Sequence, residues 1–248
     1  MAHSNIIETD SLCRDFVVGD EVVRALRNVT FSIAAGEFVS IMGTSGSGKS
    51  TLLNILGCLD TPTSGTYLID GIDVKTMDED DLSDLRNRKI GFVFQSYNLL
   101  PRTTALENVE LPLYYNRKVL VRERRERAIE ALKLVGLESR MQHTSAQLSG
   151  GQQQRVAIAR AIVNSPVLIL ADEATGNLDT RTSYEIMALV QELHAGGTTI
   201  AFVTHEPDIA AFTSRTIKLR DGHITEDYPV KTANAQAALD ALPINEDY

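Results

Sequence analysis

Apolar and polar residues alternate over the first part of the chain and predict a small antiparallel sheet. The alternation covers residues 5–10, 22–26 and 29–33, and turn-forming residues separate these runs. A period of two places one face of a strand against a core and the other face in solvent. The segment closes at Ala35-Gly36-Glu37, which is typical of a tight turn.

The middle of the chain shows continuous apolar runs that alternate with helical patterns. The apolar runs cover residues 38–42, 90–94, 167–171 and 199–203, and the helical patterns cover 50–56, 152–163 and 183–194. Strands that alternate with helices in this way form a largely parallel sheet with helices on its faces. We therefore predict an α/β fold for residues 1–228, with a mostly parallel core sheet beside an N-terminal antiparallel β subdomain.

Three further segments complete the predicted organisation. Apolar residues recur beside a charged face at 104–137, which predicts a helical subdomain over about 96–162. The short apolar runs on either side of Asp221-Gly222 predict a closing hairpin. Residues 229–248 are rich in Ala, Asn and Asp with weak periodicity, so we expect a flexible tail with one short helix.

Composition and charge narrow the class of protein. The chain has 248 residues and a formal net charge of −9, which argues against a nucleic-acid partner because phosphate affinity comes from surplus Lys and Arg. Its apolar runs are too short to cross a bilayer, and it begins without a charged-then-apolar leader. Cys13 and Cys58 lie far apart without a metal-binding spacing. These features predict a reduced, cytosolic protein.

The strongest chemical motif follows the apolar run 38–42. It fits G-x-x-x-x-G-K-[ST] and lies between a predicted strand and a predicted helix. Its glycines let backbone N–H groups converge on phosphate oxygens, and the helix N-terminus adds its positive end. We expect Lys49 to meet the β and γ phosphates of ATP and Ser50 to bind Mg²⁺. The predicted nucleotide-binding residues of this phosphate loop are Gly43, Thr44, Ser45, Gly46, Ser47, Gly48, Lys49, Ser50 and Thr51.

Two adjacent acids, Asp172 and Glu173, end the buried run 167–171. Carboxylates beside a core are costly unless a cation is nearby, and Mg²⁺ with its waters is the natural partner here. We predict that Asp172 holds the metal shell. Glu173 is then the predicted base that polarises the attacking water.

A short serine-glycine sequence precedes the helical pattern 152–163. It reads Leu148-Ser149-Gly150-Gly151-Gln152, and on its own it indicates only a serine cap. With these residues the chain resembles the ABC ATPase family, whose signature motif is this pentapeptide. The resemblance implies a P-loop NTPase fold of the ABC type. It also implies that Ser149, Gly150, Gly151 and Gln152 contact ATP held by a second copy, in a homodimer that encloses two Mg·ATP.

Other motifs of the family match this chain in the right order. Gln95 matches the Q-loop glutamine that reaches the metal, and His205 matches the switch histidine that contacts the γ-phosphate. Leu178-Asp179 matches the D-loop, which touches the other copy. Phe16 stands where the family stacks an aromatic ring on adenine, and a core aromatic is the alternative. The resemblance thus implies catalytic roles for Glu173, His205 and Lys49, and metal binding by Ser50, Gln95 and Asp172.

The resemblance covers about residues 5–226 and points to one branch of the family. Residues 91–101, 107–113 and 175–179 look most like the macrolide-export and lipoprotein-releasing ATPases. This likeness implies an integral membrane permease as partner and a peripheral position at the cytoplasmic face of the inner membrane. Ala174 and Ser145 depart from the pattern, since proline is common at both positions, and this reduces backbone stiffness without removing a reacting group.

Other functions share these motifs. An ATPase of a non-transporting transmembrane signalling complex, such as a cell-division regulator, fits equally, because only the partner differs. Family members that act on DNA need long coiled-coil insertions, and ribosomal members carry two such domains in one chain. This chain has one set of motifs with short intervals between them, which disfavours both.

The basic run at 117–127 has two interpretations. It forms either a solvated helix face with Glu–Arg pairs, or a surface that meets anionic lipid headgroups or acidic loops of a membrane partner.

Overall fold

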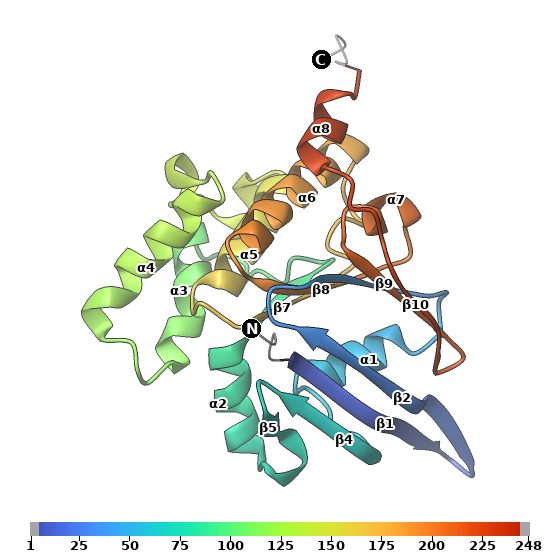
Figure 1. Ribbon diagram of the computed structural model, residues 1–248. Coiled ribbons are helices and arrows are strands. Elements are labelled where there is room, and N and C mark those ends of the chain that lie inside the picture. Colours follow the sequence, from blue (N-terminus) through green and yellow to red (C-terminus); the bar gives the residue numbers. More distant parts are fainter. Residues whose placement is uncertain (1–4, 244–248) are drawn as a thin grey trace.

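Two sheets form the framework of the protein in a computed structural model that describes residues 5–243 (Figure 1). The antiparallel sheet has the order β2-β1-β4-β5, with β1 (Asn5–Val18), β2 (Glu21–Ala34), β4 (Ser64–Ile69) and β5 (Ile72–Asp73). The six-stranded sheet has the order β10-β9-β3-β8-β7-β6, with β3 (Phe38–Met42), β6 (Ile90–Phe94), β7 (Leu168–Asp172), β8 (Thr199–Thr204), β9 (Arg215–Arg220) and β10 (His223–Pro229). Only β10 is antiparallel to its neighbour there. The predicted mostly parallel core sheet with an antiparallel subdomain is confirmed.

Helices cover the sheets and connect their strands. The helices are α1 (Lys49–Leu56), α2 (Glu79–Lys89), α3 (Ala105–Tyr115), α4 (Val121–Leu134), α5 (Gly150–Ile162), α6 (Thr180–Ala195), α7 (Pro207–Ala210) and α8 (Ala235–Asp240). Short 3₁₀ turns lie at Val74–Thr76, Glu138–Arg140 and Ser145–Gln147. Figure 1 shows α3 and α4 to one side of the sheets, where with α5 they form a helical subdomain. No helix within residues 5–243 combines the length and the apolar character needed to span a membrane.

Side-chain alternation along the central strands divides the interior into two cores. Val39 and Ile41 of β3 belong to the core that contains α1 and the antiparallel sheet, whereas Phe38 belongs to the core that contains α5 and α6. In β8, Ala201 and Phe202 divide in the same way. Strands buried on both faces are continuous apolar runs in the sequence, which explains why the sequence predicts them well.

The β1–β2 hairpin is longer than the alternation predicts, because β1 continues to Val18. Its pairing with β2 shifts register between Thr9 and Leu12, between Leu12 and Arg14, and between Arg14 and Asp15. Each irregularity changes the face on which the following side chains lie. The alternation therefore stops at residue 10 although the strand does not.

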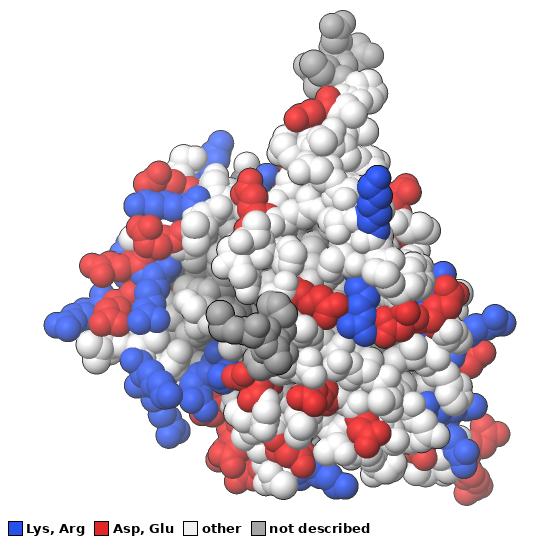
Figure 2. Space-filling view, viewed as in Figure 1, with Lys and Arg blue, Asp and Glu red and all other residues white. Residues whose placement is uncertain are grey.

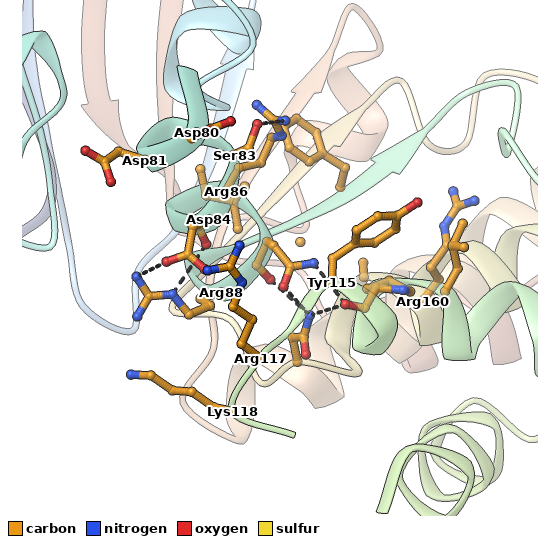
Figure 3. Close-up of a pocket in the computed structure, with 18 of the residues that line it drawn as sticks. Asp80, Asp81, Ser83, Asp84, Arg86, Arg88, Tyr115, Arg117, Lys118 and Arg160 are labelled. Atoms are coloured by element: carbon orange, nitrogen blue, oxygen red, sulfur yellow. Dashed lines mark hydrogen bonds and ion pairs between the residues drawn. The ribbon is translucent and has the colours of Figure 1, made fainter. Parts of the chain in front are cut away.

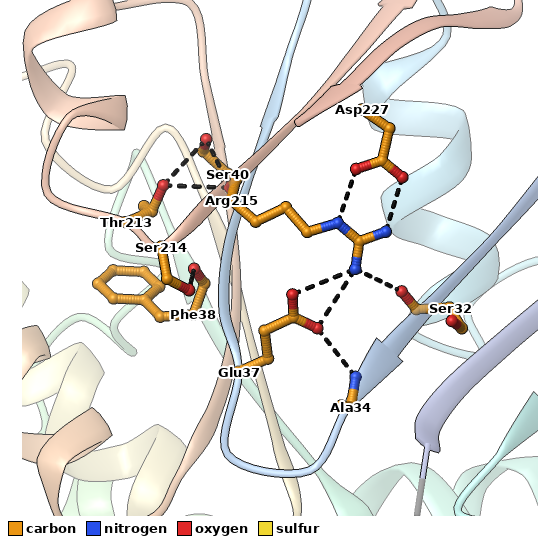
Figure 4. A network of polar contacts seen from close by, with 9 residues as sticks. All are labelled: Ser32, Ala34, Glu37, Phe38, Ser40, Thr213, Ser214, Arg215 and Asp227. Atoms are coloured by element: carbon orange, nitrogen blue, oxygen red, sulfur yellow. Dashed lines mark hydrogen bonds and ion pairs between the residues drawn. The ribbon is translucent and has the colours of Figure 1, made fainter. Parts of the chain in front are cut away.

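A network of ion pairs joins β9 to β10 and to the antiparallel sheet (Figure 4). Arg215 pairs with Asp227 of β10, with Nη2 to Oδ2 at 2.6 Å, and with Glu37, with Nη1 to Oε1 at 3.1 Å. The same guanidinium donates to the Ser32 carbonyl of β2 at 3.0 Å. Glu37 also accepts the Ala34 N–H at 3.0 Å. One side chain therefore links β9 to β10 and to β2 of the other sheet.

The C-terminal segment differs from the expected flexible tail. Ala233 donates its N–H to the Ala211 carbonyl at 2.8 Å, and the Gln191 side chain of α6 binds the Ala233 carbonyl and the Ala235 N–H, each at 2.8 Å. Ala235 is fully buried where α8, the expected short helix, packs on α6. Hydrogen bonds to backbone groups attach this segment, and an apolar pattern does not reveal them. The last part of the predicted tail, residues 244–248, lies outside the described residues.

Candidate functional site

Four neighbouring strands bring the predicted chemical residues to one edge of the parallel sheet. In the order β3-β8-β7-β6 they end at Met42, Thr204, Asp172 and Phe94. Met42 pairs with Thr204, and Asp172 pairs with both Val203 and Phe94. Neighbouring strands lie about 4.8 Å apart, so the segments that follow them form one row. This row consists of the phosphate loop, His205, Glu173 and Gln95.

The phosphate loop turns directly into α1. Gly48 is the N-cap at φ +103° and offers no side chain to cap the helix, so the first N–H groups of α1 can meet a phosphate. A Cβ at Gly48 would lie 2.6 Å from the Ala25 carbonyl oxygen, and one at Gly43 would collide with the Leu219 carbonyl oxygen. The loop therefore needs glycine where it passes β2 and β9.

Lys49 lies against this loop with its side chain buried. Its Nζ donates to the carbonyls of Gly43 at 2.8 Å and Thr44 at 3.0 Å. An ammonium group has three N–H donors, and with two used here among residues 5–243, the third suits a phosphate oxygen. The Ser47 hydroxyl is also buried and has no partner among residues 5–243.

Asp172 and Glu173 take different conformations at the end of β7. Burial, and secondarily the charge of Glu173, raises the pKa of the Asp172 carboxyl, while Lys49 opposes this shift. Glu173 leaves the strand at φ +45°, in the left-handed region that side chains other than glycine seldom adopt. Its N–H donates to the Val203 carbonyl at 2.9 Å. In this turn the Glu173 Oε1 lies 3.0 Å from His205 Nδ1, so two of the predicted catalytic side chains are in direct contact.

Gln95 is held by the segment that follows Glu173. Its Nε2 donates to Asn177 Oδ1 at 3.3 Å, and Asn177 Nδ2 donates to the Gln95 carbonyl at 3.1 Å. Gly176 makes room for the amide, because a Cβ there would lie 2.8 Å from the Gln95 Nε2. The start of the Q-loop and the segment leading into Leu178-Asp179 therefore form one hydrogen-bonded unit.

The Q-loop is also anchored to α5. Arg160 of this helix donates to the carbonyls of Asn98 at 2.6 Å and Tyr97 at 2.8 Å. Tyr97 and Asn98 both have positive φ, at +59° and +48°. Tyr97 also approaches the first turn of α5, since a Cβ at Gly150 would lie 2.9 Å from its hydroxyl. The Q-loop thus contacts α5 at two separate places.

Ser149 begins α5 with a capping box. Its hydroxyl accepts the Gln152 N–H at 3.3 Å, and the Gln152 Oε1 accepts the Ser149 N–H at 3.0 Å. Gly151 packs against Thr182 of α6, where a Cβ would lie 2.5 Å from Cγ2. The signature motif therefore lies beside the Q-loop and α6, whereas the phosphate loop lies beside β2 and β9.

Comparisons with known proteins agree with this geometry. The family model described as ABC transporter matches residues 26–176. The chain belongs to the ABC transporter family. Over 222 residues it is 53% identical to the uncharacterized ABC transporter ATP-binding protein YvrO of Bacillus subtilis. The matched region covers 90% of this chain and 96% of YvrO. The expected family is confirmed, and this cassette is an ATP-binding subunit and an ATPase of that family.

Two further likenesses concern the branch and the assembly. Over 227 residues the cassette is 51% identical to the macrolide export ATP-binding/permease protein MacB of Brucella melitensis. The matched region covers 92% of this chain but only 35% of MacB. It therefore spans about a third of that protein. The dimeric structure of the cassette MJ0796 bound to ADP and Pi matches with a TM-score of 0.83 and 48% identity, covering 92% of this chain and 100% of that one. MJ0796 comes from Methanocaldococcus jannaschii.

Phe16 of the cassette lies on the β1–β2 hairpin, outside both cores. Its ring is half-buried, and the Arg14 guanidinium lies 4.6 Å from the ring centroid while it pairs with Asp60. Phe16 pairs with Val23 of β2. Three residues farther along β2, Leu26 borders Gly48, so the strand that carries the partner of Phe16 also passes the phosphate loop. The alternative of a core aromatic is therefore wrong, and adenine stacking stays a prediction.

Three residues of this site have no individual role assigned from the sequence: Tyr97, Arg160 and Asn177. Arg160 carries one usable signal, because it is the only charged residue in the stretch 156–163 of a predicted helix. Asn177 lies in the stretch 175–179 that carries the family resemblance, but its contact with Gln95 is hidden because Gln95 lies 82 residues away in the sequence.

Proposed function

We propose that this cassette hydrolyses ATP as a pair of copies and drives an integral membrane permease of the macrolide-export or lipoprotein-release type. The row of the phosphate loop, His205, Glu173 and Gln95 is the observation that carries the proposal. It lies at the carboxyl ends of parallel strands, which is where open α/β sheets bind nucleotides.

The phosphate loop and α1 bind the triphosphate of ATP. The N–H groups of Ser50 and Thr51 lie in the first turn of α1, which has no capping side chain. The third N–H of Lys49 adds a positive donor beside them. Together these donors suit an anion with several oxygens, and Phe16 on the neighbouring hairpin supplies a ring for adenine.

The donors at this edge fit Mg²⁺. Ser50, Asp172 and Gln95 offer hydroxyl, carboxylate and amide oxygens, the hard ligands that Mg²⁺ takes together with phosphate oxygens. Gln95 uses its Nε2 for Asn177, which leaves its Oε1 for the metal. A cation would also relieve the cost of ionising Asp172, whose pKa is raised by burial. When bound, the ion neutralises charge on the transferring phosphoryl group.

Glu173 and His205 act on the attacking water and the γ-phosphate. The turn at φ +45° and the contact with His205 hold the Glu173 carboxylate in one position, as a base requires. Because Nδ1 of His205 is engaged by Glu173, Nε2 is the ring nitrogen left for the phosphate. It donates a hydrogen bond there when the ring is protonated.

A second copy supplies the signature motif. The motif Ser149-Gly150-Gly151-Gln152 lies beside the Q-loop and α6, whereas the phosphate loop lies beside β2 and β9, so we assign the motif to ATP held by the other copy. A head-to-tail pair directs the N-terminus of α5 and the Ser149 hydroxyl at the ATP of the other copy. The dimeric structures of MJ0796 support the pairing of two copies.

A cleft of about 1000 Å³ offers a docking site for the permease (Figure 3). It lies between α2, β6, α3 and α5, and its lining includes Leu111, Pro112, Tyr115, Asn98 and Arg160. Since Arg160 holds the Q-loop through Asn98, a permease segment in this cleft would contact the loop that begins at Gln95. The cassette would then work at the cytoplasmic face of the inner membrane through that partner.

Light scattering after size-exclusion chromatography tests the pairing. Glu173→Gln removes the base but keeps the binding groups, so Mg·ATP should convert this variant from monomer to dimer and phosphate release should fall by about 10²-fold or more. Adding Ser149→Arg should abolish the dimer, whereas adding Gln142→Arg, at an exposed position outside the signature motif, should not. A Glu173→Gln variant that binds ATP and stays monomeric at high concentration would contradict head-to-tail pairing.

A further inference from the structure

The connection between α3 and α4 exposes large apolar side chains at the end of the helical subdomain. We name residues 114–122 the α3–α4 tip. Tyr115, Leu120 and Val121 of this tip are 68%, 52% and 76% exposed, whereas Val119 between them is buried and fixes the tip to the core. Single exposed apolar residues are ordinary, but a group of them at one tip indicates a contact surface.

The same tip carries exposed cations. Arg117, Lys118 and Arg122 are exposed, and within residues 5–243 none of them takes part in an ion pair. Farther along α4, Arg125 and Arg127 do pair with acidic side chains. The interpretation of the basic run as a solvated helix face with Glu–Arg pairs therefore fits the body of α4. Within the described part of the chain, the cations of the tip are not neutralised by such pairs. Figure 2 shows Lys and Arg side chains gathered around this end of the molecule, at the lower left.

The tip borders the proposed permease cleft. Three residues of the tip also line the cleft: Tyr115, Arg117 and Lys118. Figure 3 shows Arg117 and Lys118 at the edge of the cleft. If a permease segment occupies the cleft, the tip lies next to that segment and faces the membrane in which the permease is embedded. This step rests on the proposed function.

We propose that the α3–α4 tip binds anionic lipid headgroups. Arg117, Lys118 and Arg122 would meet the headgroup charges, while Leu120 and Val121 would enter the boundary with the acyl chains. Cations mixed with tyrosine and aliphatic side chains suit this boundary, because each kind contacts a different depth of it. The tip is the outer end of the subdomain in Figure 1 and projects from it, so a deformable lipid surface can reach it without a complementary groove.

Sedimentation with lipid vesicles tests the proposal on the full chain. We expect more protein to bind vesicles of phosphatidylglycerol and phosphatidylethanolamine than vesicles of phosphatidylcholine, although the chain is acidic overall with a charge of −9. Arg117→Gln, Lys118→Gln and Arg122→Gln together should lower the partition coefficient at least about tenfold. The matched control, Lys75→Gln, Arg140→Gln and Lys231→Gln, removes the same charge from exposed positions elsewhere and should have little effect.

A second pair of variants tests the apolar part of the contact. Leu120→Ser with Val121→Ser should remove the binding that survives high salt, since added salt screens only the charges. The control is Val17→Ser with Val18→Ser, which changes two valines of similar exposure on the β1–β2 hairpin. This control should keep the binding that survives high salt.

Three outcomes would overturn the proposal: no preference for anionic vesicles, equal losses in the two triple variants, or binding to soluble polyglutamate but not to vesicles. The Glu173→Gln dimer assay, run without lipid on the same preparations, separates the two proposals. Dimerisation without vesicle binding overturns only the lipid contact. Vesicle binding without dimerisation overturns the head-to-tail function and leaves the lipid contact in place.

Discussion

Gln95 and Asn177 are joined by two hydrogen bonds, one from each side-chain amide. Gln95 Nε2 donates to Asn177 Oδ1 at 3.3 Å, and Asn177 Nδ2 donates to the Gln95 carbonyl at 3.1 Å. The pair fixes both the backbone at the end of β6 and the direction of the Gln95 side chain. Because Nε2 takes up the contact with Asn177, the Gln95 Oε1 would be the atom that binds a metal in the proposed site.

Loss of this pair should affect turnover more than ATP binding. We expect Asn177→Ala to lower kcat about three- to tenfold, because a misplaced ligand weakens the transition state, and to leave KM for ATP within about twofold. Steady-state ATPase assays measure both values. Ser96→Ala, an exposed change beside Gln95, is the matched control. Unchanged kcat in Asn177→Ala would show that Asn177 does not position Gln95.

Arg160 should stabilise the fold through the Q-loop carbonyls. Arg160→Met leaves the carbonyls of Tyr97 and Asn98 without their donors, and we expect a loss of about 1–3 kcal/mol in the free energy of unfolding. Arg160→Lys keeps the charge but not the planar fork, so its loss should be smaller. Urea titration gives the values.

The control for Arg160 is another arginine of the helical subdomain. Arg127→Met breaks an exposed pair with Glu123, whose N–O distance is 3.3 Å, and should cost less than about 0.5 kcal/mol. Equal losses in the two methionine variants would contradict the anchoring role of Arg160.

Asp172 should make the stability of the ligand-free chain depend on pH. Its pKa in the folded chain is raised, chiefly by burial, so the folded state binds a proton more readily than the unfolded state. Asp172 therefore stabilises the folded state fully when the pH lies below the ordinary Asp pKa of about 3.9. This stabilisation is lost as the pH rises through the raised pKa of the folded chain. Asp172→Asn should raise the melting temperature at neutral pH, and the gain should shrink as the pH is lowered.

Two further measurements complete this test. Asp20→Asn, on the exposed turn of the β1–β2 hairpin, should show no comparable gain. Mg·ATP should stabilise the parent chain more than Asp172→Asn, because the variant lacks the proposed metal ligand. A melting temperature for Asp172→Asn below that of the parent at neutral pH would contradict the prediction.

The Arg215 network should contribute to the stability of the β9–β10 edge. Asp227→Asn removes a carboxylate that forms two contacts of 2.6 Å with the guanidinium, and we expect a loss of about 1–2 kcal/mol. Glu226→Gln breaks the more exposed pair with Lys218 on the same hairpin and should cost less than about 0.5 kcal/mol. Chemical denaturation compares the two, and equal losses would show that the network adds nothing beyond a surface pair.

The sequence by itself determined the chemistry of the cassette and the order of its main elements. The phosphate loop, the acids at the end of β7 and the signature motif are contiguous residues whose spacing carries their meaning. The central strands are equally visible, because burial on both faces leaves continuous apolar runs.

Only the tertiary structure decided how those parts meet. The contact of Glu173 with His205 and the pairing of Gln95 with Asn177 join residues 32 and 82 positions apart. Strand order and register create these contacts, and a local pattern contains neither. The extended hairpin and the attached C-terminal segment escaped prediction for a related reason, because bulges and backbone hydrogen bonds hold them without leaving an apolar period in the sequence.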